Sequence, residues 1–262
     1  MWTERAEPEA EDWADLAPSH LARYLFAVEY SRGKRVLDAG AGSGYGAHLL
    51  AVHGASVVGV DIDPQVVADA QQRFADPALQ YVVDDCEKLT QVEGPFDVIC
   101  MFETIEHLQR PERFLEAARG LLAPAGLLLV STPDRAASAP FLDGRPRNPF
   151  HVQEWYRDEF QALLTAHFAD VEIRTQVQST ALAARVEALA ALRSGLMWSN
   201  PFLVFLWRKL SWGAAHRRPW KRLAGLAAPM LSDFPIVPSS VVSLFGTSQY
   251  HVGICRHAGR EK

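Results

Sequence analysis

A glycine-rich turn is the first feature of this sequence that could do chemistry. It reads DAGAGSG over residues 38–44, and an acidic residue, Asp61, lies downstream. Glycine tolerates positive φ angles and lets backbone N–H groups approach a ligand closely. A carboxylate at the end of the following strand is placed to hold both hydroxyls of a ribose. The turn and Asp61 therefore predict a site for a ribonucleoside.

Two other interpretations of the turn remain open at this point. The spacing Gly42-x-Gly44-x-x-Ala47 also fits a loose dinucleotide fingerprint, which would make the protein a nicotinamide-dependent oxidoreductase. The glycines could also make a tight connection that binds nothing. Asp85 is placed to accept a hydrogen bond from an adenine amino group, but either it or the adjacent Asp84 could simply cap a strand.

A second group of reactive side chains lies in the segment FETIEHL, residues 102–108. Glu103 is three residues from Glu106 and four from His107, so one helical turn would place all three on one face. Two carboxylates and an imidazole suit Mg²⁺, Mn²⁺ or Fe²⁺ better than a structural zinc ion. His151, which follows a loop rich in Pro, Gly and Arg, is a fourth candidate ligand.

The histidines of this group have alternative roles. His107 or His151 could act as a general base instead of a metal ligand. Alternatively, these side chains have only a structural role: the two glutamates cap the loop and His107 packs against Leu108.

Alternating strands and helices must position these residues. We expect strands at 35–38, 56–60, 79–83, 96–102 and 126–131, and helices at 20–30, 45–53, 64–74 and 111–122. This order predicts an α/β fold with a doubly wound, mostly parallel sheet. Because ligands bind beyond the carboxyl ends of such strands, the turn, Asp61, Asp85 and FETIEHL should meet at one edge.

The later part of the chain changes character. A helix at 158–167 and a strand at 171–174 are followed by a second strand only at 249–255. The segment 177–248 between them has eight basic and two acidic residues and four of the seven tryptophans. We expect a helical insertion that covers the pocket as a lid. The alternative is an interfacial surface for peripheral membrane contact, since Trp mixed with cations is typical of such segments.

Bulk properties exclude several classes of protein. The chain has 262 residues, a net charge of −5 and 48% hydrophobic residues, so nucleic acid is not an expected partner. Three cysteines without a CxxC pair argue against a disulfide framework and a thiolate zinc site. Residues 1–19 read as an acidic tail without a signal peptide's apolar core. We expect a cytoplasmic protein, with the inner membrane face as the peripheral alternative.

Five motifs together resemble the class I S-adenosylmethionine-dependent methyltransferases. They are VLDAGAGSGYG, VVGVDIDP, YVVDDCEKL, FDVICMFETIEHL and GLLLVSTP. The resemblance covers residues 20–176 and resumes at 249–262, which together would form the methyltransferase domain. It implies a Rossmann-like sheet of seven strands whose last strand is antiparallel, and S-adenosyl-L-methionine as the cofactor.

The resemblance also assigns roles to individual residues. Asp38 and the turn would surround the methionine end of the cofactor, Asp61 would take the ribose, and Asp85 with the backbone of Cys86 would take the adenine. The residues expected to bind the cofactor are Asp38, Gly40, Gly42, Gly44, Asp61, Ile62, Asp85, Cys86 and Phe102.

The pattern EhhEH followed by TP…H…EW is similar to that of the small-RNA 3′-terminal ribose methyltransferases, and its EH segment to that of the ubiquinone-biosynthesis O-methyltransferases. In the RNA enzymes this pattern binds a divalent metal that grips two adjacent hydroxyls. The matching residues are Glu103, Glu106, His107 and His151.

The acceptors of both groups contain a vicinal diol. The stretch from His20 to Gly46, with FETIEHL and NPFHV, also resembles bacterial methyltransferases encoded with glycan-building enzymes. We therefore expect O-methylation of a small molecule or glycan, assisted by Mg²⁺ or Mn²⁺ in the metal-dependent version. A non-catalytic, membrane-associated binding module is the remaining alternative.

Overall fold

The computed structural model describes residues 13–138, 145–182, 184 and 230–257. Its helices are α1 (Trp13–Ser31), α2 (Tyr45–Val52), α3 (Pro64–Arg73), α4 (Pro111–Leu121), α5 (Arg135–Ser138), α6 (Arg157–Thr165) and α10 (Val242–Phe245), with 3-10 turns η1 (Ile105–His107), η3 (Leu231–Asp233) and η4 (Ser239–Val241). Its strands are β1 (Arg35–Ala39), β2 (Ser56–Asp61), β3 (Leu79–Val83), β4 (Phe96–Phe102), β5 (Leu122–Pro133), β6 (Asp170–Ser179), β7 (Ile236–Pro238) and β8 (Gly246–Arg256).

These strands form one mixed sheet in the order β3-β2-β1-β4-β5-β8-β6-β7. β1 to β5 are parallel to one another, and β8 lies antiparallel between β5 and β6. The predicted α/β fold with a doubly wound, mostly parallel sheet and an antiparallel last strand is confirmed.

The sheet has eight strands, whereas seven were predicted. The additional strand, β7, pairs with β6 at the edge and has only three residues, the last of which is Pro238. A strand this short has too few residues to show alternation, and proline within sheets is confined to edge strands, strand starts and bulges. β7 falls in the predicted insertion 177–248, of which residues 183 and 185–229 lie outside the described residues.

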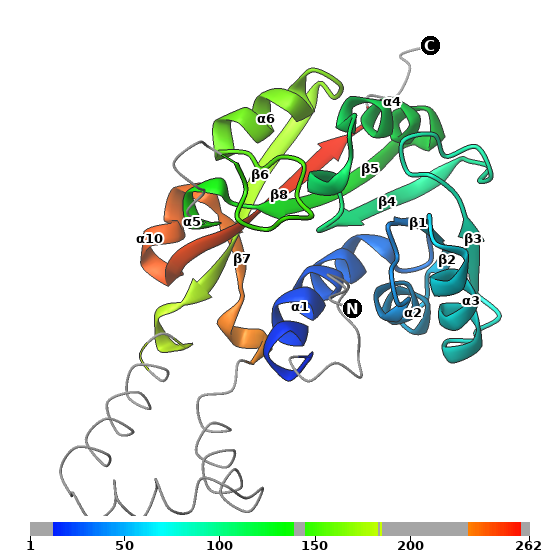
Figure 1. The fold of residues 1–262 in the computed structure, drawn as a ribbon, viewed down its shortest axis with the longest axis horizontal. Helices are drawn as coiled ribbons and strands as arrows, with labels where there is room; N and C mark the ends of the chain where they lie inside the picture. The colour runs from blue at the N-terminus through cyan, green and yellow to red at the C-terminus, as the bar shows by residue number, and fades with distance from the viewer. Residues whose placement is uncertain (1–12, 139–144, 183, 185–229, 258–262) are drawn as a thin grey trace, which may run out of the picture.

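The two sides of the sheet are covered by different helices (Figure 1). Met101 packs in a hydrophobic cluster with Phe114 of α4 and Phe160 of α6. Its neighbour Phe102 packs in a second cluster, with Tyr24 of α1. Successive residues of a strand point to opposite sides of the sheet, so these clusters mark two faces, which we call the α6 face and the α1 face.

Helix α1 begins at Trp13, seven residues before the predicted start at His20. Residues 13–19 had been placed in the acidic tail because of their composition and because the apolar periodicity starts at His20. Acidic residues are also favoured in the first turn of a helix, where they complement its dipole. Composition therefore could not distinguish an acidic tail from the start of a helix. In the part of the chain that the structure describes, no helix is both long and apolar enough to cross a membrane.

Helices α1 and α2 approach each other at Gly46. A Cβ atom added there would lie 1.9 Å from Cζ of Tyr24, which is far closer than two non-bonded carbon atoms can approach. The absence of a side chain at Gly46 is therefore what lets the Tyr24 ring lie over the first turn of α2.

We predict opposite effects for two helical glycine substitutions. Gly46→Ala should lower the free energy of unfolding by about 1–3 kcal/mol, because the Tyr24 ring must move. Gly120→Ala in α4 is the matched control: a Cβ there meets nothing within 4 Å, so the change should be neutral or stabilising by up to about 1 kcal/mol. Urea unfolding measures both values, and equal effects of the two substitutions would contradict the packing at Gly46.

Candidate functional site

The glycine turn leaves β1 with three left-handed residues. Gly40, Gly42 and Gly44 have φ angles of +81°, +52° and +85°. A Cβ on Gly40 would collide with Thr104, and one on Gly44 with the Tyr81 hydroxyl, whereas one on Gly42 would meet nothing within 4 Å. The first and third glycines are required for packing inside the protein, and Gly42 is the one that leaves space for a ligand.

Asp61 connects the end of β2 to this turn. Its Oδ2 accepts a hydrogen bond from Gly42 N at 3.1 Å, and its Oδ1 accepts one from Asp63 N at 3.0 Å. A carboxylate has about four lone-pair positions, so both oxygens can accept further bonds from ribose hydroxyls. The adjacent Ile62 is 65% exposed, which leaves an apolar side chain beside the carboxylate.

The two aspartates after β3 have different roles. Asp84 is buried and accepts hydrogen bonds from Asp85 N at 2.8 Å and from Gln91 N at 2.6 Å, so it is the residue that caps the strand end. Asp85 is partly exposed, and its Oδ2 lies 2.8 Å from Nζ of Lys88. The hydrogen bond from Lys88 is the main cause that holds the pKa of Asp85 below its usual value, so Asp85 is an ionised acceptor at this edge.

Cys86 and Phe102 are both buried, with 7% of each residue exposed. Burial raises the pKa of the Cys86 thiol, and nearby aspartates including Asp61 raise it further. Cys86 is therefore a neutral thiol, which fits the prediction that it contributes its backbone. Phe102 packs edge-to-face against Tyr24 with ring centroids 5.1 Å apart.

Asp38 lies inside the α1 face, beneath the glycine turn. It is fully buried, and both carboxylate oxygens lie 3.2 Å from the hydroxyl of Tyr24, which donates to them. Burial raises the pKa of Asp38 to about 7, the Tyr24 hydrogen bond acts against this rise, and the charge of Asp61 adds to it. Asp38 therefore exchanges its proton near neutral pH.

A buried cation, Arg23, lies on the same face and was not predicted. Its Nη1 donates to Oε1 of Gln176 at 2.5 Å, and its guanidinium carbon lies 4.4 Å from the centroid of the Tyr250 ring. Burial acts to lower the pKa of Arg23, but Glu103 and its other neighbours raise it above its ordinary value. Nε and Nη2 of Arg23 are buried without a hydrogen-bond partner.

Glu103 also belongs to the α1 face. Its Oε1 accepts a hydrogen bond from Oγ of Ser131 at 2.7 Å, and its Oε2 lies 3.9 Å from Nη2 of Arg23. The prediction had placed Glu103 with the other metal ligands on one helical turn. Instead, its φ angle of +52° interrupts the helical path before the 3-10 turn η1, and the structure does not bring Glu103 into the group.

The other three predicted ligands do come together. One potential ligand atom from each of Glu106, His107 and His151 lies within 4.8 Å of the other two. The His107 and His151 rings are nearly perpendicular, with centroids 5.0 Å apart. The loop that carries His151 is held against η1 because Val152 N donates to the Glu106 carbonyl at 2.8 Å.

Each histidine has its Nδ1 beside an acceptor. His107 Nδ1 lies 3.0 Å from the Phe150 carbonyl, and His151 Nδ1 lies 2.7 Å from Oε1 of Glu154. These partners assign the proton of each neutral ring to Nδ1, which makes Nε2 the unprotonated nitrogen.

Glu106 is 1% exposed, and neither of its carboxylate oxygens has a hydrogen-bond partner. Burial raises the pKa of Glu106 well above its usual value, and the charge of Glu103 adds to this effect. A buried carboxyl without a partner is costly, so this position suits a group that binds something the protein chain itself does not provide.

Sequence reasoning missed Arg23, Tyr24 and Glu154. A signal for the first two existed, because Arg23 and Tyr24 lie on the helical stripe that starts at His20 and continues to Ala27. A charged residue within an apolar stripe marks a buried charge that needs a partner. Glu154 is the glutamate of the TP…H…EW pattern, but its contact with His151 depends on the conformation of an irregular loop and could not be inferred from that pattern.

The chain matches known proteins over the region that forms this site. A family model described as a methyltransferase domain matches residues 10–187. The chain belongs to this family. Its sheet and cofactor motifs are those of a class I S-adenosylmethionine-dependent methyltransferase, so the family match decides against the nicotinamide alternative.

Two curated relatives resemble part of this methyltransferase. A probable S-adenosylmethionine-dependent methyltransferase of Mycobacterium tuberculosis is 39% identical over 153 residues, which are 58% of this chain and 55% of the relative. A ubiquinone biosynthesis O-methyltransferase of Coxiella burnetii is 34% identical over 137 residues, 48% of this chain and 58% of the relative. The chain thus spans a little over half the length of these relatives.

The fold is also found in solved methyltransferase structures. An S-adenosylmethionine-dependent methyltransferase of Thermotoga maritima superposes with a TM-score of 0.61 at 14% identity, covering 94% of this chain and 93% of that one. At this identity the likeness concerns the fold alone.

We predict that a methyl group on Gly42 blocks the cofactor. Gly42→Ala should weaken S-adenosylmethionine binding by about tenfold or more, a loss of roughly 1.4 kcal/mol, because its Cβ occupies the open space beside Asp61. Gly33→Ala is the matched control: Gly33 also has a positive φ, +70°, and nothing lies within 4 Å of its added Cβ. Both substitutions strain the backbone, but Gly33→Ala should bind the cofactor normally in isothermal titration calorimetry. Equal affinities of the two variants would disprove the assignment of Gly42.

Proposed function

We propose that this methyltransferase transfers the methyl group of S-adenosylmethionine to a hydroxyl of a small molecule or glycan that bears a vicinal diol, with the help of a divalent cation. The observation that carries the proposal is the group Glu106, His107 and His151, in which a buried carboxylate without a partner faces two imidazoles. The Coxiella burnetii relative, an O-methyltransferase by name, supports a hydroxyl as the acceptor.

The cofactor would lie over the glycine turn. The backbone of Gly42 allows close approach, Asp61 offers two acceptor oxygens to the ribose, and the exposed side chain of Ile62 offers an apolar surface to the adenine. At the methionine end, Arg23 is a buried cation with two N–H nitrogens that lack hydrogen-bond partners, which suits the carboxylate of the methionine moiety.

The chemistry of the three residues fits a divalent cation. Nδ1 of each histidine lies beside an acceptor, so Nε2 is the unprotonated nitrogen of both rings, and Glu106 contributes two oxygens without hydrogen-bond partners. Nε2 of His151 lies 2.9 Å from Nδ2 of Asn148 and would exchange this donor for the cation. Two imidazoles with one carboxylate suit Mn²⁺ better than Mg²⁺, because Mg²⁺ prefers oxygen ligands. A bound cation of this kind lowers the pKa of a coordinated hydroxyl and orients it for attack on the sulfonium methyl group.

The chain's own residues would have a different role in each version of the reaction. In the metal-dependent version, ionised Glu106 would hold the cation and compensate its charge in a buried site. In the metal-free version, Nε2 of His107 or His151 would accept the hydroxyl proton as a general base. In either version, the acceptor hydroxyl must lie next to the two histidines.

The insertion at 177–248 remains a separate prediction. A lid over the pocket, or a basic and aromatic surface for a membrane and a lipid-linked acceptor, would both involve residues 185–229, which lie outside the described residues.

The two glutamates of the FETIEHL motif should differ in their contribution to cation binding. We predict that Mn²⁺ binds the full chain, and that Glu106→Gln weakens this binding by about tenfold or more, since a charged ligand is lost. Glu103→Gln is the matched control from the same motif, and it should leave the Mn²⁺ affinity within about twofold, because Glu103 contacts Ser131 and Arg23 instead.

Isothermal titration calorimetry gives these affinities. A methyl-transfer screen over catechols, glycans and RNA ends, with and without chelator, then tests the acceptor class. Absence of Mn²⁺ binding together with chelator-resistant methylation would reject the metal-dependent version, and transfer only to acceptors that lack a diol would reject the acceptor class.

A further inference from the structure

We propose that Glu154 is a positioning residue, which fixes the tautomer of His151 so that Nδ1 carries the proton and Nε2 is the unprotonated ring nitrogen. This inference deepens the proposed function, because it rests on the same three-residue group as the acceptor site. It concerns the hydrogen bond between Nδ1 of His151 and the carboxylate of Glu154.

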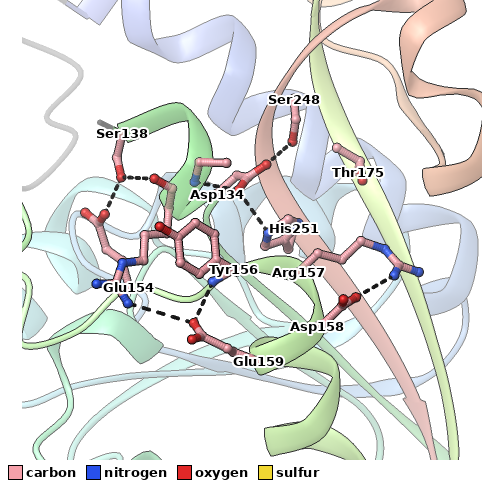
Figure 2. A network of polar contacts seen from close by, with 12 residues as sticks. Asp134, Ser138, Glu154, Tyr156, Arg157, Asp158, Glu159, Thr175, Ser248 and His251 are labelled. Carbon is pink, nitrogen blue, oxygen red and sulfur yellow. Dashed lines mark hydrogen bonds and ion pairs between the residues drawn. The ribbon is translucent and has the colours of Figure 1, made fainter. Parts of the chain in front are cut away.

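The His151–Glu154 contact is short and shielded from water. Nδ1 of His151 lies 2.7 Å from Oε1 of Glu154, and the two side chains are only 9% and 3% exposed. The second oxygen of Glu154 accepts a hydrogen bond from the Ser138 hydroxyl (Figure 2). A carboxylate is an acceptor only, so the nitrogen that faces it must carry the proton.

The other nitrogen of the ring has a matching donor. Nε2 of His151 lies 2.9 Å from Nδ2 of Asn148. The orientation of this amide is fixed independently, because Phe150 N donates to Oδ1 of Asn148 at 3.1 Å and thereby assigns the donor nitrogen to the histidine side. Nε2 therefore accepts a hydrogen bond in this state, as the nitrogen with the free electron pair must.

The loop that carries these residues is fastened at both ends. Asp134 follows β5 and forms a bridge with Trp155, and Arg135 N donates to the Trp155 carbonyl at 3.1 Å. Oδ2 of Asp134 accepts a hydrogen bond from Oγ of Ser248 at 2.5 Å, and its Oδ1 lies 3.3 Å from Nε2 of His251 (Figure 2). The backbone next to Glu154 is therefore anchored at the end of β5.

A histidine whose Nδ1–H donates to a carboxylate presents a more basic Nε2 in a fixed direction. Such a ring can serve as a ligand or as a base without first changing tautomer. The pair would thus be useful in both versions of the proposed mechanism. A purely structural role for Glu154 would instead be satisfied by any buried group that accepts from Ser138.

Nitrogen NMR spectroscopy of the histidine rings in the full-length protein tests the proposal. Long-range ¹H–¹⁵N spectra of ¹⁵N-histidine-labelled protein at pH 8 distinguish a protonated from an unprotonated ring nitrogen, and His151→Gln identifies the signals of His151. We predict that Nδ1 of His151 is protonated and Nε2 is not. Glu154→Leu should remove this pattern and let the Nε2–H form appear, whereas Glu112→Gln on the exposed side of α4 should change nothing.

A protonated Nε2 in the wild-type protein, in the other tautomer or in the imidazolium, would overturn the proposal. So would an unchanged His151 pattern in a folded Glu154→Leu variant. If that variant does not fold, the wild-type spectrum and the isosteric Glu154→Gln variant decide instead, since an amide is a weaker acceptor and should shift the Nδ1 proton signal upfield.

Mn²⁺ titration separates this inference from the proposed function. Glu154→Gln should weaken Mn²⁺ binding by about 10- to 100-fold, as loss of a partner behind a ligand commonly does. If the wild-type protein binds no Mn²⁺, the metal-dependent function fails, while the ring spectra still decide whether Glu154 sets the tautomer. Unchanged Mn²⁺ affinity in Glu154→Gln would count against the positioning role.

Discussion

The alternation of side chains along β5 divides the polar groups of this protein into two separate sites. Val130 belongs to the hydrophobic cluster of the α6 face, so the next residue, Ser131, points to the α1 face and Thr132 to the α6 face again. Ser131 contacts Glu103 there. Thr132 is paired with His251, whose ring lies stacked against Phe160 of α6. The proposed cofactor site and the proposed acceptor site both depend on this separation of polar side chains onto two faces of the sheet.

Each face holds a different kind of charge. On the α1 face, Asp38 and Arg23 are completely buried with few partners, and the pKa of Asp38 is raised to about 7. Buried charges of this kind are unfavourable unless a ligand compensates them. On the proposed function, the methionine end of the cofactor, with its ammonium and carboxylate groups, would provide that compensation. Glu106 and the two histidines form a second polar group, where a cation or an acceptor hydroxyl would provide the compensation.

Much of the fold and of the cofactor site could be predicted from local sequence. Strands such as β4 are nearly uninterrupted apolar runs, and the glycine turn needs residues that tolerate positive φ, so both leave a signal within a few neighbouring positions. The roles of Gly40 and Gly44 were only partly foreseen. They are required by Thr104 and Tyr81, which lie far away in the sequence and could not be recognised as neighbours.

The errors also have physical reasons. Glu103 was grouped with Glu106 by helical spacing, but a single left-handed residue redirected its side chain to the other face. Arg23 was missed because its partners, Gln176 and Tyr250, come from strands at the far end of the chain. Residue types and spacing thus grouped Glu106, His107 and His151, which the structure brings together. Assignment of each side chain to a face required the backbone conformation.

Anomalous X-ray diffraction tests this division most directly. Crystals of the full chain grown with S-adenosylhomocysteine and Mn²⁺ would locate the cation and the cofactor in one experiment. We predict a manganese peak coordinated by Glu106, His107 and His151, with the amino-acid end of the cofactor on the α1 face near Arg23. A peak coordinated by Glu103, or no peak at saturating Mn²⁺ in crystals that hold the cofactor, would contradict this prediction.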